Sequence, residues 1–292
     1  MSPNVKRRTK LLAAAGMILT TIIWGSAFVV MKNSVDVIPP TYLLALRFTL
    51  AAIGLGILFF PLVRRTTRSD FKCGAVLGFW LFVSYFFQTY GLKYTTASKN
   101  PFITTLYVIL VPFINWGINR LRPGENNLFA AVAAVIGLAL ITLEGDLGVN
   151  RGDVLTLICS ISFSLHMVFI ARYTKDHDPT LMTFFQMAVS AALCWLVAPV
   201  LEGGLSFSVL GEPSIAMGIL YLPFFSSMRG FLLQTVGQKY LSANTSSILL
   251  SFESVFGLVF AVIFLDDPLT ARLLFGCALM FGAVILSEYK HG

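Results

Sequence analysis

The chain has 292 residues, of which 57% are hydrophobic and only 12% are charged. Water-soluble domains carry about 25% charged residues, so this composition excludes an ordinary soluble fold and indicates an integral membrane protein. A net charge of +7 would suit a nucleic-acid partner in a soluble protein. Here the Lys and Arg residues stand in short clusters between apolar runs, which is typical of membrane topology, and we expect no nucleic-acid partner.

Apolar runs follow one another along the whole chain, each long enough to cross about 30 Å of hydrocarbon as a helix. The first five cover residues 11–31, 41–63, 71–92, 97–120 and 127–144. The second five cover residues 153–172, 181–200, 214–235, 243–265 and 270–288. Lipid offers no hydrogen-bond partner to free backbone amides, so each run is expected to be helical. The sequence therefore predicts an all-α polytopic membrane protein with ten transmembrane helices.

The basic residues of the predicted loops are unevenly shared between the two sides of the membrane. With a cytoplasmic N-terminus, the cytoplasmic side receives the clusters at 6–10, 64–72, 120–122 and 172–175 together with Lys239 and Lys290. The other side receives Lys32, Lys93, Lys99, Arg151 and Arg272. Cytoplasmic loops are the ones enriched in Lys and Arg. We expect a multi-pass protein of a bacterial plasma (inner) membrane with both termini in the cytoplasm.

One motif occurs twice, at residues 88–97 and 234–243. The first copy reads Gln-Thr-Tyr-Gly-Leu-Lys-Tyr-Thr-Thr-Ala and the second Gln-Thr-Val-Gly-Gln-Lys-Tyr-Leu-Ser-Ala, 146 residues later. Two halves, at 1–148 and 149–292, would each hold five spans, and because five is odd the second half enters the membrane inverted. Inverted repeats support alternating access around a site at the midplane. The glycines of the motif, Gly91 and Gly237, are hinge candidates.

The order of several further motifs is characteristic of one family. They are Trp24-Gly25-Ser26-Ala27-Phe28 with Lys32, Pro40 with Leu46-Arg47-Phe48, the stretch Gly91–Ala97, Pro112, Gly152-Asp153 and Glu253. With ten spans in two halves, the chain resembles the EamA family of the drug/metabolite transporter superfamily over nearly its whole length. The family often has a Glu-Pro pair in the ninth helix. Here Ser254 follows Glu253, which argues against a proline kink at that point.

The resemblance implies a permease for small metabolites, often amino acids or related compounds, that frequently works as an exporter. It also implies a central cavity between the two halves that opens alternately to each side of the membrane. A passive facilitator or channel, and a nucleotide-sugar or drug exchanger of the same superfamily, remain as alternatives. A nucleotide sugar would call for several cations in the cavity, and only Arg47 and Arg229 lie within spans.

Two charged residues within the predicted spans are the main candidates for the site. Glu253 lies near the middle of its span, where a carboxylate is costly unless it is paired or faces a cavity. It is a candidate proton carrier or partner of a substrate amine, the alternative being a structural Glu held by Ser251, Ser254 or backbone groups. Arg47 is able to hold a substrate carboxylate through two parallel hydrogen bonds. Alternatively it reaches towards the membrane surface or binds a loop carbonyl.

A histidine and four aromatic residues complete the predicted site. His166 is a second proton-coupling candidate, because its charge changes near neutral pH, with a packing role as the equal alternative. Trp24, Trp80, Tyr107 and Phe225 are expected near the middle of their spans and are candidates to line the substrate cavity. The alternative for each is a lipid-facing or packed ring.

Other chemistries find little support in the sequence. Cys73, Cys159, Cys194 and Cys277 have no metal or redox spacing, and three scattered histidines predict no metal site. No phosphate-binding loop of the Gly-x-x-x-x-Gly-Lys-Ser/Thr type occurs, so ATP hydrolysis by that route is not expected. We expect no cofactor and no enzymatic activity, because a membrane enzyme would call for clustered His, Asp or Glu. The expected partners are a small metabolite, the lipid bilayer and, as open alternatives, protons and a second copy of the chain.

Overall fold

The computed structural model describes residues 3–35, 37–94, 99–142, 150–205, 213–265 and 270–288, and these ranges contain helices and no strand. The first part comprises α1 (Pro3–Val35), α2 (Pro40–Leu58), α3 (Phe60–Val63), α4 (Arg68–Tyr94), α5 (Lys99–Thr105), α6 (Tyr107–Asn119) and α7 (Glu125–Thr142). The second comprises α8 (Arg151–Tyr173), α9 (Pro179–Glu202), α10 (Pro213–Tyr221), the π-helical segment η2 (Leu222–Arg229), α11 (Gly230–Tyr240), α12 (Ala243–Leu250), α13 (Phe252–Leu265) and α14 (Ala271–Glu288).

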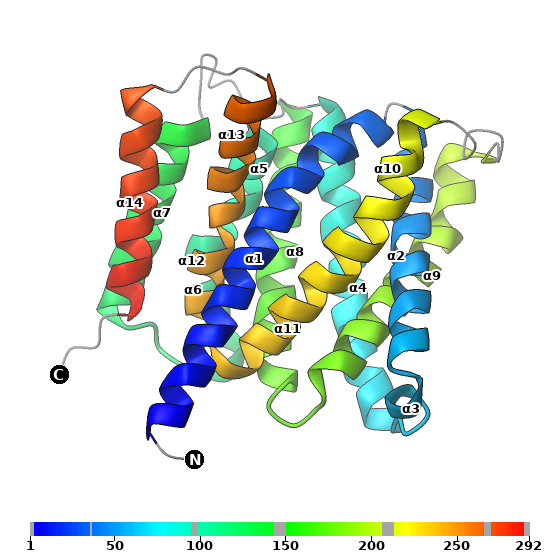
Figure 1. Cartoon of the computed structure of the whole chain (residues 1–292), viewed down its shortest axis with the longest axis horizontal. Helices are drawn as coiled ribbons and strands as arrows, with labels where there is room; N and C mark the ends of the chain where they lie inside the picture. Colours follow the sequence, from blue (N-terminus) through cyan, green and yellow to red (C-terminus); the bar gives the residue numbers. More distant parts are fainter. Residues whose placement is uncertain are drawn as a thin grey trace.

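The helices stand side by side in a bundle, and α1 begins on the same side of it as α14 ends (Figure 1). We call this the N-side and the opposite side the far side. Helices α4, α8 and α9 pack on one another, α2 packs on α9, and α1 packs on α11 and α13. Helices α7 and α14 form a pair at one edge of the view.

Small residues allow the closest helix contacts. A Cβ atom added to Gly78 of α4 would lie 2.6 Å from the Cβ atom of Val189 on α9. One added to Gly137 of α7 would lie 2.7 Å from the backbone oxygen of Gly276 on α14. Small side chains are the usual means of close approach between helices in membranes, because lipid supplies no hydrophobic force that would push the helices together.

Within the described ranges, five helices are long and apolar enough to cross a membrane, and they lie within α1, α2, α4, α8 and α9. Shorter apolar helices cover Ile103–Asn119, Glu125–Leu140 and Leu274–Ala283. Large apolar side chains also point outward, for example Val200 at 82% exposed and Leu196 at 71%. An apolar outer surface of this kind suits lipid and not water. The chain is therefore an all-helical, multi-pass membrane protein, as the composition predicts.

A carboxylate connects three helices at the far side. No side chain of its own caps the start of α2. Instead Glu202, the last residue of α9, accepts hydrogen bonds from the backbone amides of Thr41 at 3.0 Å and Tyr42 at 3.3 Å. It also accepts one from the Tyr90 hydroxyl of α4 at 2.6 Å. A negative charge is favourable at a helix N-terminus, so this cap from another helix stabilises α2 and binds it to α9 and α4.

An ion pair has a similar role at the N-side. The Nδ1 atom of His177, in the loop before α9, lies 2.6 Å from Oδ1 of Asp70 in the first turn of α4. Asp178 of the same loop caps α9 by accepting from the amide of Thr180 at 2.8 Å. The loop is thereby held to α4 on one flank and to α9 on the other.

Candidate functional site

Two adjoining chambers lie in the interior of the bundle. The first is lined by Trp24, Ala27, Met31, Arg47, Tyr85, Gln88, Ser226 and Glu253. The second is lined by Trp24, Tyr85, Gln88, Thr104, Tyr107, Phe163, Met167, Gln234, Leu250 and Glu253. Because four residues line both chambers, the two form one continuous site, built by helices from both halves of the sequence.

Arg47 is buried, with 3% of its surface exposed, and does not extend towards the membrane surface. Its Nε atom donates to the hydroxyl of Ser227, and its Nη2 atom donates to Ser226 Oγ at 2.8 Å and to the Tyr85 hydroxyl at 3.3 Å. The Nη1 atom contacts only the sulfur of Met31, at 3.9 Å. In the described part of the chain no carboxylate forms a salt bridge with this guanidinium. Neutral hydroxyls thus fix its plane, and Glu253 acts on its charge through space without forming a salt bridge.

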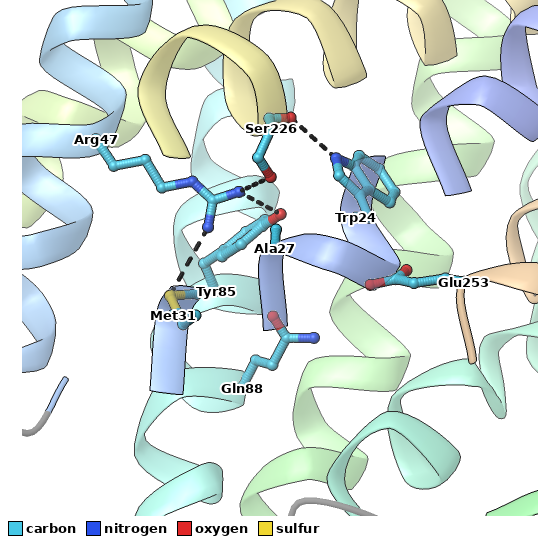
Figure 2. Close-up of a pocket in the computed structure, with 8 residues that line it drawn as sticks. All are labelled: Trp24, Ala27, Met31, Arg47, Tyr85, Gln88, Ser226 and Glu253. Carbon is cyan, nitrogen blue, oxygen red and sulfur yellow. Dashed lines mark hydrogen bonds between the residues drawn. The ribbon is translucent and has the colours of Figure 1, made fainter. Parts of the chain in front are cut away.

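Two of the partners of Arg47, Ser226 and Ser227, belong to the π-helical segment η2, which contains Pro223. In a π-helix some backbone carbonyls are not used by the helix's own hydrogen bonds and can accept from other groups. Such segments are frequent at functional sites. The backbone oxygen of Ser226 accepts a hydrogen bond from Nε1 of Trp24 at 2.9 Å, while its hydroxyl accepts from Arg47 (Figure 2). Segment η2 therefore joins α1 and α2 at the chamber wall.

Glu253 occupies the opposite side of the first chamber from Arg47 (Figure 2). It lies in the first turn of α13, directly after an interruption of the helix at Ser251. The helix is thus broken here without the proline of the family pattern. The Ser251 hydroxyl donates to the backbone oxygen of Ile248, and no described residue forms a hydrogen bond with the Glu253 carboxylate. The carboxylate is consequently free to interact with the contents of the chambers.

The same interruption occurs in the first half of the chain. Helix α5 ends at Thr105 and α6 begins at Tyr107, so the break lies at Leu106. Tyr107 and Glu253 are 146 residues apart, which is the separation of the repeated motif, and both line the second chamber. The helix breaks therefore place the two residues at matching positions of the two halves.

Aromatic rings form a wall beside the chambers, and two of them, Trp24 and Tyr85, line both. Trp24 contacts Phe231 with 4.9 Å between ring centroids, and Tyr85 contacts Phe163 at 5.5 Å. Tyr85 and Phe231 also differ by 146 in number and lie 5.9 Å apart. Such a wall presents apolar faces to a ligand, together with the polar tips of the indole and phenol rings.

His166 lies behind this wall and is not among the residues that line the two chambers. It is fully buried, and its Nε2 atom lies 2.7 Å from Oε1 of Gln186. Gln186 donates a hydrogen bond through Nε2 to the hydroxyl of Thr235, and this hydroxyl donates to the backbone carbonyl of Phe231. The Gln186 oxygen must therefore accept, which places the His166 proton on Nε2. The Nδ1 atom has no partner among the described residues.

The remaining predicted residues lie in different surroundings. Trp80 packs edge-on against Phe79 and lines neither chamber. Phe225 is 43% exposed and stacks on Tyr221, away from both chambers. Of the predicted residues, Trp24, Tyr107, Arg47 and Glu253 are the ones that meet at the site. Their role in substrate binding stays a prediction.

The two hinge candidates lie inside helices at points of close packing. A Cβ atom on Gly91 would lie 3.1 Å from the backbone oxygen of Gly152, and one on Gly237 would lie 3.0 Å from Cε of Met17. Close approach is thus one reason for glycine at both positions. A hinge movement at either remains a prediction.

Several lining residues escape prediction from sequence alone. Gln88 and Gln234 open the two copies of the repeated motif, so the repeat itself was the signal that could have identified them. Tyr85 and Ser226 carry no such signal, because nothing in an apolar helix tells which face borders a cavity. No group of His, Cys, Asp and Glu in the described ranges is arranged to hold a metal ion.

A bundle of apolar helices around an interior site with two charged residues fits a membrane transport protein. The model of the EamA-like transporter family matches residues 11–143 and 150–289, and the chain belongs to this family. An uncharacterized transporter of Archaeoglobus fulgidus is 32% identical over 282 residues, covering 96% of this chain and 87% of the relative. A "Probable amino-acid metabolite efflux pump" of Escherichia coli is 23% identical and covers 93% of both chains. A protein of known crystal structure, 18% identical, shares the fold with a TM-score of 0.77 over 94% of this chain and 96% of its own.

Proposed function

We propose that the protein is a secondary transporter that exports small zwitterionic metabolites, such as amino acids or related compounds, by alternating access. One observation carries the proposal: Arg47 and Glu253 border the same chamber from opposite sides, and neither is paired with an opposite charge by a salt bridge among the described residues. A zwitterion supplies a carboxylate that can pair with Arg47 and an ammonium group that can pair with Glu253.

In this proposal each of the two residues binds one end of the substrate. The guanidinium of Arg47 is held by Ser226, Ser227 and Tyr85, so its Nη1 atom remains for a substrate carboxylate. Glu253 is available to a substrate ammonium group. Buried charges are costly unless they are paired, so a ligand that pairs both gains from each contact. The name of the E. coli relative, an amino-acid metabolite efflux pump, agrees with this substrate class and with export.

The architecture of the bundle supports an inverted pair of five-span halves. One residue separates α2 from α3, α5 from α6 and α12 from α13, while α10, η2 and α11 are continuous. Joined in this way, the described helices form ten successive rods. The family model matches twice, once in each half, which agrees with domains at 1–148 and 149–292. In this proposal the chambers open alternately to the two sides of a bacterial inner membrane, and both termini are cytoplasmic.

Proton coupling fits the same site. Glu253 forms no hydrogen bond with a described residue, so it is able to exchange a proton for the substrate ammonium group. His166 is separated from the chambers by the aromatic wall and would act only through Gln186. The outward-facing apolar side chains of α7 and α14 would suit lipid or, as an alternative, a second copy of the chain.

The proposal is tested by measuring export with Glu253 altered. Metabolites in the medium are compared by mass spectrometry for cells that express the intact protein, the Glu253→Gln variant or an empty vector. We expect amino-acid-like compounds that only the intact protein enriches. Asp153→Asn, which changes a carboxylate in the first turn of α8 and outside both chambers, is the matched control and should retain export. Equal export by Glu253→Gln and intact protein at equal expression would refute the role of the charge pair.

A facilitator is distinguished from a carrier by counterflow. Purified protein in liposomes loaded with unlabelled substrate should accumulate labelled substrate transiently, because a carrier exchanges one molecule for another. A pore would show no such accumulation.

A further inference from the structure

The second chamber contains two polar atoms that no described residue satisfies. They are the Oε1 atom of Gln234 and the hydroxyl of Tyr107, and both side chains line the chamber. Gln234 is 1% exposed and Tyr107 is 4% exposed, so bulk water does not reach either side chain to any extent. Buried polar groups are nearly always hydrogen-bonded, and an unpaired one is costly. The two atoms therefore call for a partner inside the chamber.

A chain of hydrogen bonds fixes which atom of Gln234 is left over. The Nε2 atom of Gln238 donates to the backbone oxygen of Met167 at 2.9 Å, and a carbonyl can only accept. The other amide atom of Gln238, its Oε1, is therefore left to accept, and it accepts a hydrogen bond from Nε2 of Gln234 at 3.2 Å. Gln234 cannot turn its amide over without losing this bond. Its oxygen, an acceptor, is thus the atom that remains without a partner.

Tyr107 complements this acceptor. A phenol hydroxyl can donate one hydrogen bond and can also accept. Together the two residues offer an obligatory acceptor and a group that donates. The ligand group that satisfies both must itself donate and accept, and hydroxyl and carboxamide groups do so. An alkyl group satisfies neither, and a carboxylate has no proton to give to Gln234 and would also lie in a chamber bordered by Glu253.

We propose that the second chamber binds the side chain of the substrate through a hydroxyl or carboxamide group, which donates to Gln234 and accepts from Tyr107. This inference rests on the proposed function, in which Arg47 and Glu253 hold the carboxylate and ammonium groups in the first chamber. The substrate class is then a zwitterion with a neutral, hydrogen-bonding side chain. Alkyl and acidic side chains are rejected, because they leave the buried oxygen of Gln234 unpaired.

Two pairs of substrates with nearly equal shapes test the inference. Uptake of L-threonine is compared with L-valine, and L-glutamine with L-glutamate, using the purified full chain in proteoliposomes. We expect the intact protein to favour threonine over valine and glutamine over glutamate by about tenfold or more in kcat/KM, which corresponds to about 1.4 kcal/mol. Gln234→Leu should reduce the threonine preference to about threefold or less by removing the acceptor.

Two further variants provide a control and an independent test of the same inference. Val236→Leu changes an apolar side chain of the same helix, α11, that is 37% exposed and lines neither chamber, so it should leave the threonine preference unchanged. Tyr107→Phe removes one hydroxyl and should lower the preference in the same direction as Gln234→Leu. It decides the question if the Gln234 variant does not fold.

The outcomes separate this inference from the function on which it rests. Equal transport of threonine and valine by the intact protein would overturn the inference and leave the zwitterion transporter in place. An undiminished preference in both Gln234→Leu and Tyr107→Phe would overturn it in the same way. Transport of none of the four amino acids would refute the proposed amino-acid substrate and this side-chain class together.

Discussion

Replacement of Arg47 by lysine tests whether the fork of its guanidinium, and not only its charge, holds the chamber wall. The structure gives Arg47 hydrogen bonds to Ser226, Ser227 and Tyr85 through two of its nitrogens. A lysine ammonium is a compact charge without this planar arrangement, and we expect it to keep one of the three contacts. Hydrogen bonds between membrane helices contribute about 0.6 kcal/mol on average and up to about 1.7. The loss of two should therefore lower the free energy of unfolding by about 1–3 kcal/mol.

The assay is unfolding of the purified protein in detergent, followed by tryptophan fluorescence, because Trp24 bonds to the same segment as Arg47. Arg229→Lys is the matched control. Arg229 belongs to η2 as well, but it is exposed and lies over the ring of Phe225 at 4.5 Å, so its replacement should change the free energy by less than about 0.5 kcal/mol. An Arg47→Lys protein as stable as the intact one, or equal losses in both variants, would refute the reasoning.

Two further predictions concern helix packing and capping. Gly78→Val should lower the unfolding temperature and the yield of folded protein, because its Cβ atom would lie 2.6 Å from Val189 Cβ; Gly117→Val, with nothing within 4 Å of an added Cβ, should be tolerated in the same detergent assay. Glu202→Ala should cost about 0.5–2 kcal/mol by removing the cap of α2, and it should speed hydrogen exchange of the Thr41 amide, measured by mass spectrometry. Unchanged exchange at Thr41 would contradict the capping role of Glu202.

The sequence predicts the helical fold well, because the apolar runs are separated by charged clusters and turn residues. It does not predict where these helices are interrupted. Runs 97–120 and 243–265 read as single spans, yet the structure breaks them at Leu106 and Ser251. Neither position is proline or glycine, so the local signal for a break is missing. A linear pattern of apolar residues therefore does not record either interruption.

The site is predictable where a residue is unusual for a membrane span. Arg47 and Glu253 stand out because a charge in lipid is costly, and both border the first chamber. Aromatic residues are common in every span, so Trp80 and Phe225 are no more conspicuous than Trp24 in the sequence although they line neither chamber. A helix that is apolar all round gives no information about which of its faces borders a cavity.

The π-helical segment η2 has a mechanical consequence for the second chamber. It holds its residues in a wider turn than the α-helices on either side, whereas the matching stretch of α4 in the first half is regular. If η2 tightened to an α-helix, α11 would rotate about its own axis relative to α10. A shift of one residue along an α-helix corresponds to a rotation of about 100°. Phe231 and Gln234 would then turn away from their present neighbours together. The two halves of the site thus differ: the wall formed by α4 is a regular helix, whereas the wall formed by η2 and α11 contains a π-helical segment whose tightening would rotate α11.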